Sequence, residues 1–356
     1  MDLKLKKSTI KSFSNDLIGW YAKNKRELPW RKTKDPYKIW LSEIILQQTK
    51  VAQGLPYYLK FEKKYPNVSV LANASEDEVL KLWEGLGYYS RARNLLKTSK
   101  IIFHKLNGVF PSAYKDLIVL PGIGDYTASA ISSFSVNEIN PVVDGNVYRF
   151  LSRFIGIKTP INTNKSLKEF RNIAKTLISK KNPSDFNQAI MEYGALVCKP
   201  ISPCCEKCIF KNKCFAFFNK EISNLPVKNK KKKVRDRFFN FLIFKSDNNQ
   251  TIIEKRKEND IWQNLYQFPL IETDNEVNHD MILDKLCESD YFDSLEIKID
   301  LFKNKSFSHK LSHQNIHSSF WLIKVKSVHI NEVSILDLNL YPFPKPISNF
   351  ISIYNW

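Results

Sequence analysis

The pattern of hydrophobic and polar positions changes once along the chain, from one typical of helices to one typical of strands. Residues 14–220 have the pattern of helices joined by short turns. One helix is predicted to open at Asp35 and Pro36, because Asp caps a helix and Pro suits its first position, and to continue through Lys50. Another opens at residues 75–78, where three acidic residues favour the positive end of the helix dipole. Further helices are predicted near 90–106, 112–119, 125–136, 145–155, 165–180 and 184–197.

Beyond residue 237 the pattern predicts strands. Residues 238–244 and 251–255 are predicted to form a hairpin, and residues 318–325 another strand. The lysine-rich run at 229–235 has no periodicity, which predicts a solvated linker that could also contact DNA. We therefore expect a multidomain chain, without an internal repeat, whose parts are an all-α region at 1–220, a basic linker at 221–236 and a mixed α+β domain at 237–356.

Length and charge narrow the class of protein. The chain has 356 residues, enough for two or three domains, and no run of eighteen apolar residues that would predict a membrane span. Its N-terminus lacks the apolar core of a signal peptide. The formal charge of +19 favours a polyanion such as nucleic acid. Many Lys, Asn, Ile and Phe with few Gly would also follow from AT-rich coding, so charge alone does not decide.

Four cysteines with the spacing Cys198-x6-Cys205-x2-Cys208-x5-Cys214 form a complete metal-ligand set within seventeen residues. Crowded thiolates repel one another unless a positive centre binds them. A disulfide pair is the alternative, but nothing else predicts secretion. Zinc is the stronger alternative, although zinc sites usually have two closely spaced pairs and only Cys205 and Cys208 form one here. The unequal spacing favours a [4Fe–4S] cluster, with Cys204 as a bystander thiol, in a reducing cytoplasm.

Two glycines, Gly122 and Gly124, lie between helical segments in the sequence Leu-Pro-Gly-Ile-Gly. Such a turn can present backbone N–H groups to a phosphate, or it can be only a turn. Asp144 follows about twenty residues later, after Val142 and Val143. It is either a helix N-cap or a functional carboxylate held beside the hairpin.

Glu43 is the second candidate carboxylate, in the largely apolar stretch from Ile39 to Thr49. It lies either at the wet edge of its helix or in a desolvated position, where its pKa would rise and it would hold a proton at neutral pH. Hydrolysis of an N-glycosidic bond needs a protonated leaving base and a stabilised cationic sugar. Glu43 and Asp144 have the chemistry for these two tasks.

With these residues, the chain resembles the helix-hairpin-helix DNA glycosylases that carry a [4Fe–4S] cluster, and within them the adenine DNA glycosylases of the MutY type. The resemblance covers about residues 15–350. The order and spacing of its motifs are specific: residues 27–31, residues 42–49, residues 83–93, the glycine hairpin, residues 143–147 and the four cysteines.

The resemblance implies double-stranded DNA as partner, with the adenine mispaired with 8-oxoguanine or guanine flipped out of the helix. Glu43 would protonate the adenine and later handle the water, and Asp144 would stabilise the oxocarbenium-like sugar. Tyr126 and Asn146 match residues that support this carboxylate. Further matches to pocket or DNA-contact positions are Arg26, Leu28, Trp30, Arg31, Gln48, Thr49, Gly122 and Gly124. Tyr88 matches a side chain wedged into the base stack beside the oxidised guanine.

Tyr126 distinguishes two relatives. Endonuclease III-type enzymes have a Lys at this hairpin position, which forms a Schiff base and cuts the strand. With Tyr126 there, we expect a monofunctional glycosylase with weak or no lyase activity. The neighbouring Asp125 departs from the expected pattern, because a negative charge does not help a phosphate-binding hairpin; it could cap the following helix.

The C-terminal part resembles the family's Nudix-type 8-oxoguanine-recognition domain, through residues 261–269 and Phe307, Ser308 and His309. The glutamate-rich Nudix catalytic box is absent, so this domain is expected to recognise the base and not to hydrolyse. Without the resemblance, these three residues would be interpreted as a turn at a strand end. The expected protein is a monomer without a membrane partner, cytoplasmic and associated with the bacterial nucleoid.

Two other functions remain open at this point. A bifunctional pyrimidine glycosylase/lyase has the same fold and would form a covalent adduct with DNA. A non-enzymatic DNA-binding protein that carries a cluster would be unaffected by Glu43→Gln.

Overall fold

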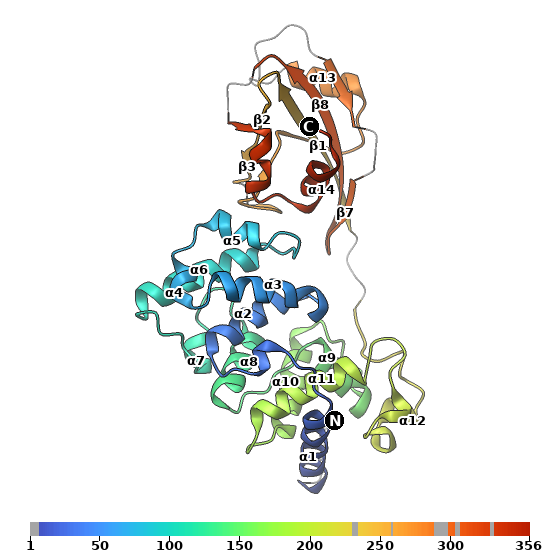
Figure 1. Ribbon diagram of the computed structural model, residues 1–356. Coiled ribbons are helices and arrows are strands. Elements are labelled where there is room, and N and C mark those ends of the chain that lie inside the picture. Colours follow the sequence, from blue (N-terminus) through green and yellow to red (C-terminus); the bar gives the residue numbers. More distant parts are fainter. Residues whose placement is uncertain (1–6, 230–233, 258, 288–297, 303–306, 328–330) are drawn as a thin grey trace. The chain divides into compact units, whose positions relative to one another are not determined.

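The computed structural model describes residues 7–229, 234–257, 259–287, 298–302, 307–327 and 331–356 (Figure 1). The chain divides into two compact units. The first contains Met1–Asn73 and Asn94–Lys230, and the second contains Ala74–Arg93 and Lys231–Trp356. Part of the predicted basic linker lies outside the described residues.

The first unit is helical, as predicted. Its elements are α1 (Lys7–Asn24), α2 (Pro36–Leu46), α3 (Val51–Lys64), α4 (Val68–Ala72), most of α6 (Ser90–Lys105), α7 (Tyr114–Leu117), α8 (Asp125–Val136), α9 (Gly145–Leu151), α10 (Asn164–Leu177), α11 (Pro183–Leu196) and α12 (Phe215–Phe218). Asp35 caps α2 as expected, because its carboxylate accepts from the backbone N–H of Tyr37 at 2.9 Å. The helix ends at Leu46, four residues before the predicted end, and Gln48 has a left-handed φ of 55°.

The core of this unit is aromatic and joins α1, α9, α10 and α11. Phe13, Phe150 and Phe186 are buried in it, and Phe210 from the cysteine-rich segment packs against Phe13 with ring centroids 4.8 Å apart. Gly194 allows α11 to approach α9 closely, because a Cβ there would lie 2.7 Å from the backbone oxygen of Asn146. Phe210 also packs against Tyr193 of α11, with ring centroids 5.4 Å apart, so the N-terminus of α9 and the cysteine-rich segment both contact α11.

The second unit is built around a mixed sheet. Its strand order is β5 (Leu270–Thr273), β1 (Arg235–Ser246), β8 (Gln314–Val325) and β6 (Lys298–Leu301), and β7 (Phe307–Lys310) also pairs with β8. The two long strands β1 and β8 run parallel, side by side in Figure 1, and the other pairs in this sheet are antiparallel. Two small sheets pair β2 (Gln250–Ile252) with β9 (Glu332–Ser334), and β3 (Glu254–Lys255) with β4 (Tyr266–Gln267).

Both faces of β1 are covered, which explains its nearly continuous apolar run. Leu242 and Phe244 pack in a cluster with Ile282 and Leu286 of α13 (His279–Cys287). On the alternate positions, Phe241 stacks on Phe320, which in turn stacks on Phe350 of α14 (Lys345–Ile353) with centroids 4.2 Å apart.

The predicted hairpin of residues 238–244 and 251–255 is wrong. A turn does form, since the N–H of Asn249 donates to the carbonyl of Ser246 at 3.1 Å. However, β1 pairs with β5 and β8, whereas β2 pairs with β9. The alternation of apolar residues identified the strands but not their partners.

The segment Ala74–Arg93 belongs to the second unit although it precedes the rest of that unit by more than a hundred residues. Its helix α5 (Glu76–Leu82) begins where the acidic residues predict a helix start, and Ser75 and Glu78 form a capping box there. Asp77 accepts from the Lys255 ammonium at 2.6 Å and from the Tyr266 hydroxyl at 3.0 Å. The sequence order alone does not reveal this packing.

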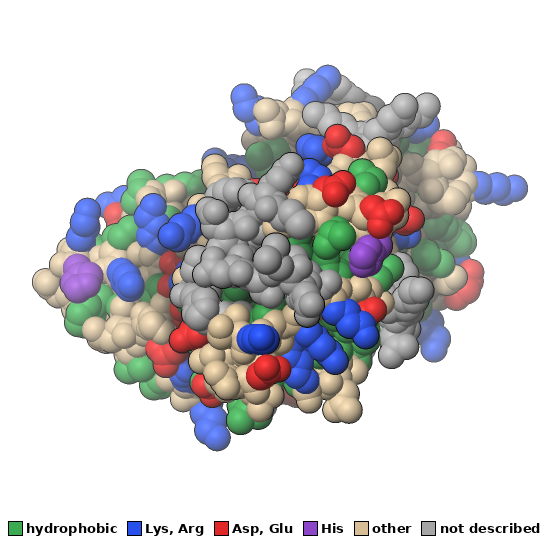
Figure 2. Space-filling model, turned by 90° about the horizontal axis from the view of Figure 1, so that it is seen from above, with side chains coloured by type: hydrophobic (Ala, Val, Ile, Leu, Met, Phe, Trp, Pro, Cys, Tyr) green, Lys and Arg blue, Asp and Glu red, His purple; other side chains and the backbone are tan. Residues whose placement is uncertain are grey.

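Charged side chains are interspersed on the face drawn in Figure 2, where Lys and Arg lie among acidic and polar side chains. Among the side chains coloured there, Lys and Arg are thus mixed with Asp and Glu. Among the helices that the structure describes, none combines the length and the apolar character needed to cross a membrane.

Candidate active site

Glu43 is buried on α2, with 7% of its surface exposed. Burial raises its pKa to about 7, and a nearby Asp144 adds to the rise, while the Tyr126 hydroxyl and Arg31 oppose it. The Tyr126 hydroxyl donates to Oε2 of Glu43 at 2.9 Å. Of the two interpretations left open by the sequence, the structure thus favours desolvation over the wet edge of the helix. A carboxyl group with this pKa is half protonated near neutral pH and can act as a general acid.

Asp144 is the N-cap of α9. Its Oδ1 accepts from the backbone N–H groups of Asn146 and Val147 at 2.9 and 2.8 Å, and its Oδ2 accepts from the Asn146 side chain at 2.6 Å. Burial raises the pKa of Asp144, and these hydrogen bonds and the charge of Arg149 counteract the rise. The cap and the functional carboxylate are therefore compatible, because the same donors that cap the helix also stabilise an anion.

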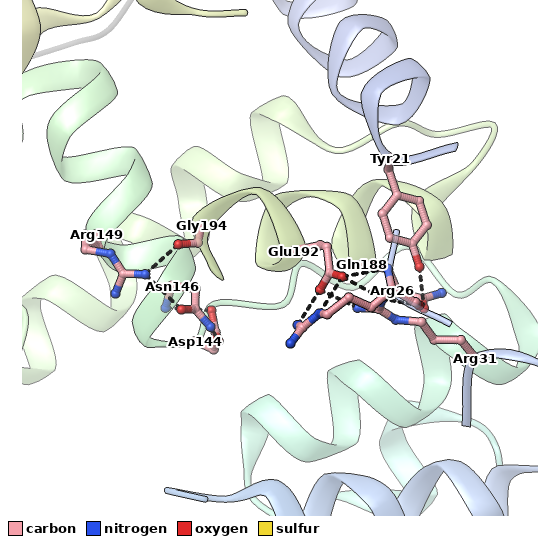
Figure 3. A network of polar contacts seen from close by, with 9 residues as sticks. All are labelled: Tyr21, Arg26, Arg31, Asp144, Asn146, Arg149, Gln188, Glu192 and Gly194. Carbon is pink, nitrogen blue, oxygen red and sulfur yellow. Dashed lines mark hydrogen bonds and ion pairs between the residues drawn. The ribbon is translucent and has the colours of Figure 1, made fainter. Parts of the chain in front are cut away.

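Arg149 fixes the orientation of Asn146. Its guanidinium donates to Oδ1 of Asn146 at 2.9 Å, to the carbonyl of Gly194 at 2.6 Å and to the carbonyl of Cys198 at 2.7 Å. Figure 3 shows this group on one side of α11, and a second polar group around Glu192 on the other. Asp144 is thus connected through Asn146 and Arg149 to the start of the cysteine-rich segment.

Glu192 organises the second group and was missed in the sequence. It is 1% exposed and accepts from Arg26 at 2.8 and 2.6 Å and from Arg31 at 2.9 and 2.7 Å (Figure 3). Burial alone would raise its pKa, but the two guanidinium groups lower it to about 2. An acid within the apolar run from Ala189 to Tyr193 is the same signal that drew attention to Glu43.

Two adjoining cavities share the residues Glu43, Leu46, Tyr126 and Asp144. The inner one has a volume of about 160 Å³, and the outer one about 710 Å³. Predicted site residues that line the inner cavity are Arg26, Leu28, Trp30, Arg31, Glu43, Thr49, Tyr126, Asp144 and Asn146. Gln48 and Gly124 line the outer cavity. The two candidate carboxylates therefore lie where the two cavities meet.

Two family models match the chain. The model of the HhH-GPD superfamily of base excision DNA repair proteins matches residues 41–175, and a NUDIX domain model matches residues 240–352. The adenine DNA glycosylase of Buchnera aphidicola subsp. Schizaphis graminum is 36% identical over 360 residues, which cover 97% of this chain and 99% of the relative. The chain belongs to the adenine DNA glycosylase family. The adenine DNA glycosylase of Mus musculus is 40% identical over 217 residues, or 58% of this chain and 42% of the relative.

Solved structures agree with the family for the helical region. A thermostable thymine-DNA glycosylase superposes with a TM-score of 0.55 at 29% identity, over 59% of this chain and 97% of that one. An endonuclease III in a non-covalent complex with DNA superposes with a TM-score of 0.53 at 22% identity, over 61% of this chain and 98% of that one, which shows a shared fold. The predicted helical glycosylase fold followed by a Nudix-like domain is confirmed.

The glycine hairpin of this adenine DNA glycosylase family member forms between α7 and α8. Gly122 has a φ of 74°, and a Cβ there would lie 2.7 Å from the Cβ of Asn94, so both conformation and space require glycine. Gly124 is the N-cap of α8 and lines the outer cavity, whereas Gly122 lines neither cavity. The suggestion that Asp125 caps α8 is wrong, because Asp125 is the first residue inside the helix and pairs with Arg171 and Tyr114.

The four predicted cluster ligands line one pocket together with Cys204, Arg153 and apolar side chains. The five cysteines of this segment are free thiols, which contradicts the disulfide alternative. Arg153 contacts Sγ of Cys198 at 3.6 Å, and the Tyr193 hydroxyl contacts Sγ of Cys208 at 3.1 Å. In the described residues, however, no three or more His, Cys, Asp or Glu side chains are grouped closely enough to hold a metal ion.

The remaining predicted residues of the family site lie in the second unit. Tyr88 has a φ of 47° and is 48% exposed, and the Arg91 guanidinium lies 5.7 Å from its ring. Phe307, Ser308 and His309 are on strand β7, so a turn at this position is wrong. They line a cavity of about 320 Å³ with residues of α14. Phe307 is buried against Phe320, and burial lowers the pKa of His309.

Proposed function

We propose that this protein is a monofunctional DNA glycosylase that hydrolyses the N-glycosidic bond of adenine mispaired with 8-oxoguanine or guanine, in base excision repair. The observation that carries the proposal is the pair Glu43 and Asp144 at the junction of the two cavities, one with a pKa of about 7 and the other bound by three N–H donors. Family membership supports adenine as the base.

The two cavities suit the two halves of an extruded nucleotide. The base occupies the inner cavity, and its sugar and phosphates occupy the outer one. Extrusion costs a few kcal/mol, and it costs least at a mispair, which contributes to selectivity. Protonated Glu43 donates to the leaving adenine, so that the base departs as a neutral molecule. Asp144 stabilises the positive charge that develops on the sugar, and Glu43, now ionised, accepts a proton from the attacking water.

Tyr126 supports hydrolysis without strand cleavage. A Schiff base requires a lysine or another amine close to the sugar. Among the described residues that line the two cavities, none is a lysine, and the Tyr126 hydroxyl is engaged with Glu43. The product is therefore an abasic site in an intact strand.

We also propose that Cys198, Cys205, Cys208 and Cys214 hold one [4Fe–4S] cluster. The shared pocket, its apolar lining and the contacts from Arg153 and Tyr193 to two of the sulfurs fit a group that binds thiolates. Bound there, the cluster would cross-link the loops around these residues. Pure protein is then brown with an absorbance shoulder in the near-violet, and Cys208→Ser loses this shoulder. A colourless protein with bound zinc would contradict the cluster.

The second unit supplies recognition of the base opposite the adenine, through Tyr88 as the wedge and Phe307, Ser308 and His309 as the sensor of the oxidised base. We retain the sequence-based division into a catalytic region at 1–220, a linker at 221–236 and a recognition domain at 237–356. Limited proteolysis that cuts first within the linker would support it. We expect a monomer, to be checked by sedimentation, that associates with the bacterial nucleoid.

The deciding experiment measures single-turnover base release from duplexes that carry adenine opposite each of the four normal bases and opposite 8-oxoguanine. We expect release opposite 8-oxoguanine and guanine, and strand breaks only after alkali treatment. Glu43→Gln should abolish release while binding of the same duplex persists. Release of a pyrimidine, or a strong adduct after borohydride reduction, would instead support the bifunctional glycosylase/lyase.

A further inference from the structure

Asp125 follows the glycine hairpin directly, where a negative charge would repel a DNA backbone. In the structure it is held by two side chains. The Tyr114 hydroxyl donates to Oδ1 of Asp125 at 2.6 Å, and the Arg171 guanidinium of α10 forms an ion pair with the same oxygen. The guanidinium also lies 5.6 Å from the ring of Tyr114. Asp125 and Tyr114 therefore fix Arg171 beside the hairpin.

Arg171 remains accessible in this arrangement, because 34% of its side chain is exposed. A guanidinium has five N–H donors, and its contact with a single oxygen of Asp125 leaves others that can face a ligand. Burial lowers the pKa of Arg171, but the hydrogen bonds and charges of Tyr114 and Asp125 raise it by more. The net shift is upward, so the cation is stabilised.

The charged residues that line the outer cavity distinguish Arg171 from the other residues there. Three acidic residues line this cavity: Glu43, Asp125 and Asp144. Of the described residues that line it, Arg171 is the one with a positive charge. A DNA strand whose nucleotide is extruded toward Glu43 and Asp144 must bring its flanking phosphates into or next to this cavity. Without a cation there, Asp125 and Asp144, together with Glu43 when it is ionised, would oppose its entry.

We propose that Arg171 binds a backbone phosphate next to the extruded nucleotide, and that Asp125 and Tyr114 are positioning residues that hold it for this contact. The inference rests on the proposed function, because it takes a DNA strand as the ligand. According to this proposal, Asp125 affects DNA binding in the opposite direction from the one that its negative charge suggests. As a purely repulsive charge, Asp125 would weaken DNA binding, whereas as a positioning residue it strengthens binding.

The experiment measures the dissociation constant at several KCl concentrations by fluorescence anisotropy. The probe is a duplex with a tetrahydrofuran abasic analogue opposite 8-oxoguanine, which cannot be processed. Each phosphate contact contributes about 0.9 to the slope of log K against log[salt] for duplex DNA. Arg171→Ala should lower the steepness of the slope by about this amount and weaken binding about five- to tenfold near 0.1 M salt. Lys175→Ala is the matched control, since this exposed residue of α10 carries the same charge but does not line the cavity.

Asp125→Asn tests the positioning role through the direction in which it changes DNA binding. We expect weaker binding and a shallower slope, and little further loss in the double variant Asp125→Asn/Arg171→Ala. Tyr114→Phe should shift the slope in the same direction by less. Tighter or unchanged binding by Asp125→Asn would overturn the positioning role, and a slope for Arg171→Ala equal to that of Lys175→Ala would overturn the phosphate contact. Thermal unfolding of each variant confirms that the folded protein is compared.

The outcomes for the inference and for the proposed function are separable. If the wild-type protein releases adenine but Arg171→Ala leaves the slope unchanged, the inference fails and the function stands. If the wild-type protein releases no adenine, the function fails, while the salt dependence still reports whether Arg171 contacts DNA.

Discussion

Glu43 and Glu192 line the same inner cavity, but their surroundings drive their pKa values apart. Glu43 has one hydroxyl donor and a neighbouring carboxylate, so burial dominates and its pKa rises to about 7. Glu192 is bound by two guanidinium groups, and its pKa falls to about 2. At neutral pH one residue can donate a proton, while the other is a fixed anion that orients the arginines of the pocket.

The raised pKa of Glu43 predicts a cost in stability. The unfolded chain loses this proton near pH 4.5 and the folded protein near pH 7, so the free energy of unfolding falls as the pH rises between these values. Glu43→Gln removes the ionisable group. At pH 8 the variant should be more stable than the wild type by about 1–3 kcal/mol. The difference should vanish near pH 4.5, and urea unfolding at the two pH values measures it. Equal stability at both pH values would mean that Glu43 is not desolvated.

The same residue predicts the pH dependence of the reaction. In the proposed mechanism base release needs protonated Glu43, so the single-turnover rate should fall as the pH rises above about 7. A rate that is constant between pH 6 and 9 would assign the proton donor to another group.

Glu192 has the opposite effect on how the stability of the fold depends on pH. Its lowered pKa stabilises the fold above pH 4.5, and this contribution is lost as the pH falls from there toward 2. Glu192→Gln leaves Arg26 and Arg31 without their anion and should cost about 2–4 kcal/mol at pH 7, measured by urea unfolding. Glu27→Gln is the control, since Glu27 forms an exposed pair with Lys32 at 3.2 Å. It should change the stability by less than about 0.5 kcal/mol.

Individual residues differ in how far sequence could predict them. The position of an acid in an apolar helical stretch indicated Glu43, and the family motif at residues 143–147 indicated Asp144. The pair of Glu192 with Arg26 and Arg31 spans more than 160 residues and depends on how α11 meets the loop before α2. Without an alignment, no local pattern connects these residues, so only the folded chain reveals the ion pairs.

At the scale of elements, local sequence signals predicted where helices begin better than they predicted which helices and strands pack together. The cap at Asp35 and the helix start at residues 75–78 are where the sequence predicts them, because such signals depend on the first turn of their own helix. The pairing of β1 with β8 was not predicted, because parallel strands are joined by a long connection and their register depends on burial of both faces. The packing of α5 was not predicted either, because its partners in β3 and β4 lie far away in the sequence.

The packing of α5 can be tested with a double-mutant cycle. Asp77→Asn and Lys255→Met should each destabilise the protein, and their coupling energy should be about 1 kcal/mol because Asp77 is held by two donors. Urea unfolding of the wild type, the single variants and the double variant gives this coupling. The exposed pair of Glu27 and Lys32 serves as the reference and should show a coupling near zero. Equal coupling in the two pairs would show that α5 is not fixed to the second unit.

At the scale of the molecule, neither charge nor the order of the chain delimits the functional parts. The net charge of +19 indicated a polyanion, yet the face in Figure 2 mixes both signs, and acids outnumber bases among the charged residues that line the outer cavity. The second compact unit is likewise not a contiguous stretch, since it takes in Ala74–Arg93. Tyr88, the predicted wedge, is therefore part of the same unit as the predicted sensor residues of β7.

This arrangement predicts what happens when the linker is cut. A protease site engineered into residues 230–233 would divide the chain into two fragments, and Ala74–Arg93 on the first would still pack against the second. Beyond the contacts of Asp77, the Lys81 ammonium donates to the carbonyl of Tyr341 at 3.0 Å, and Arg93 donates to the carbonyl of Gln263 at 2.8 Å. The fragments should therefore elute together from a sizing column. A chain that ends at Asn229 should bind a hydrophobic dye and unfold about 5–10 °C lower, because the packed face of α5 has lost its partners. Fragments that separate at micromolar concentration would show that the contacts of Ala74–Arg93 are too weak to hold the two fragments together.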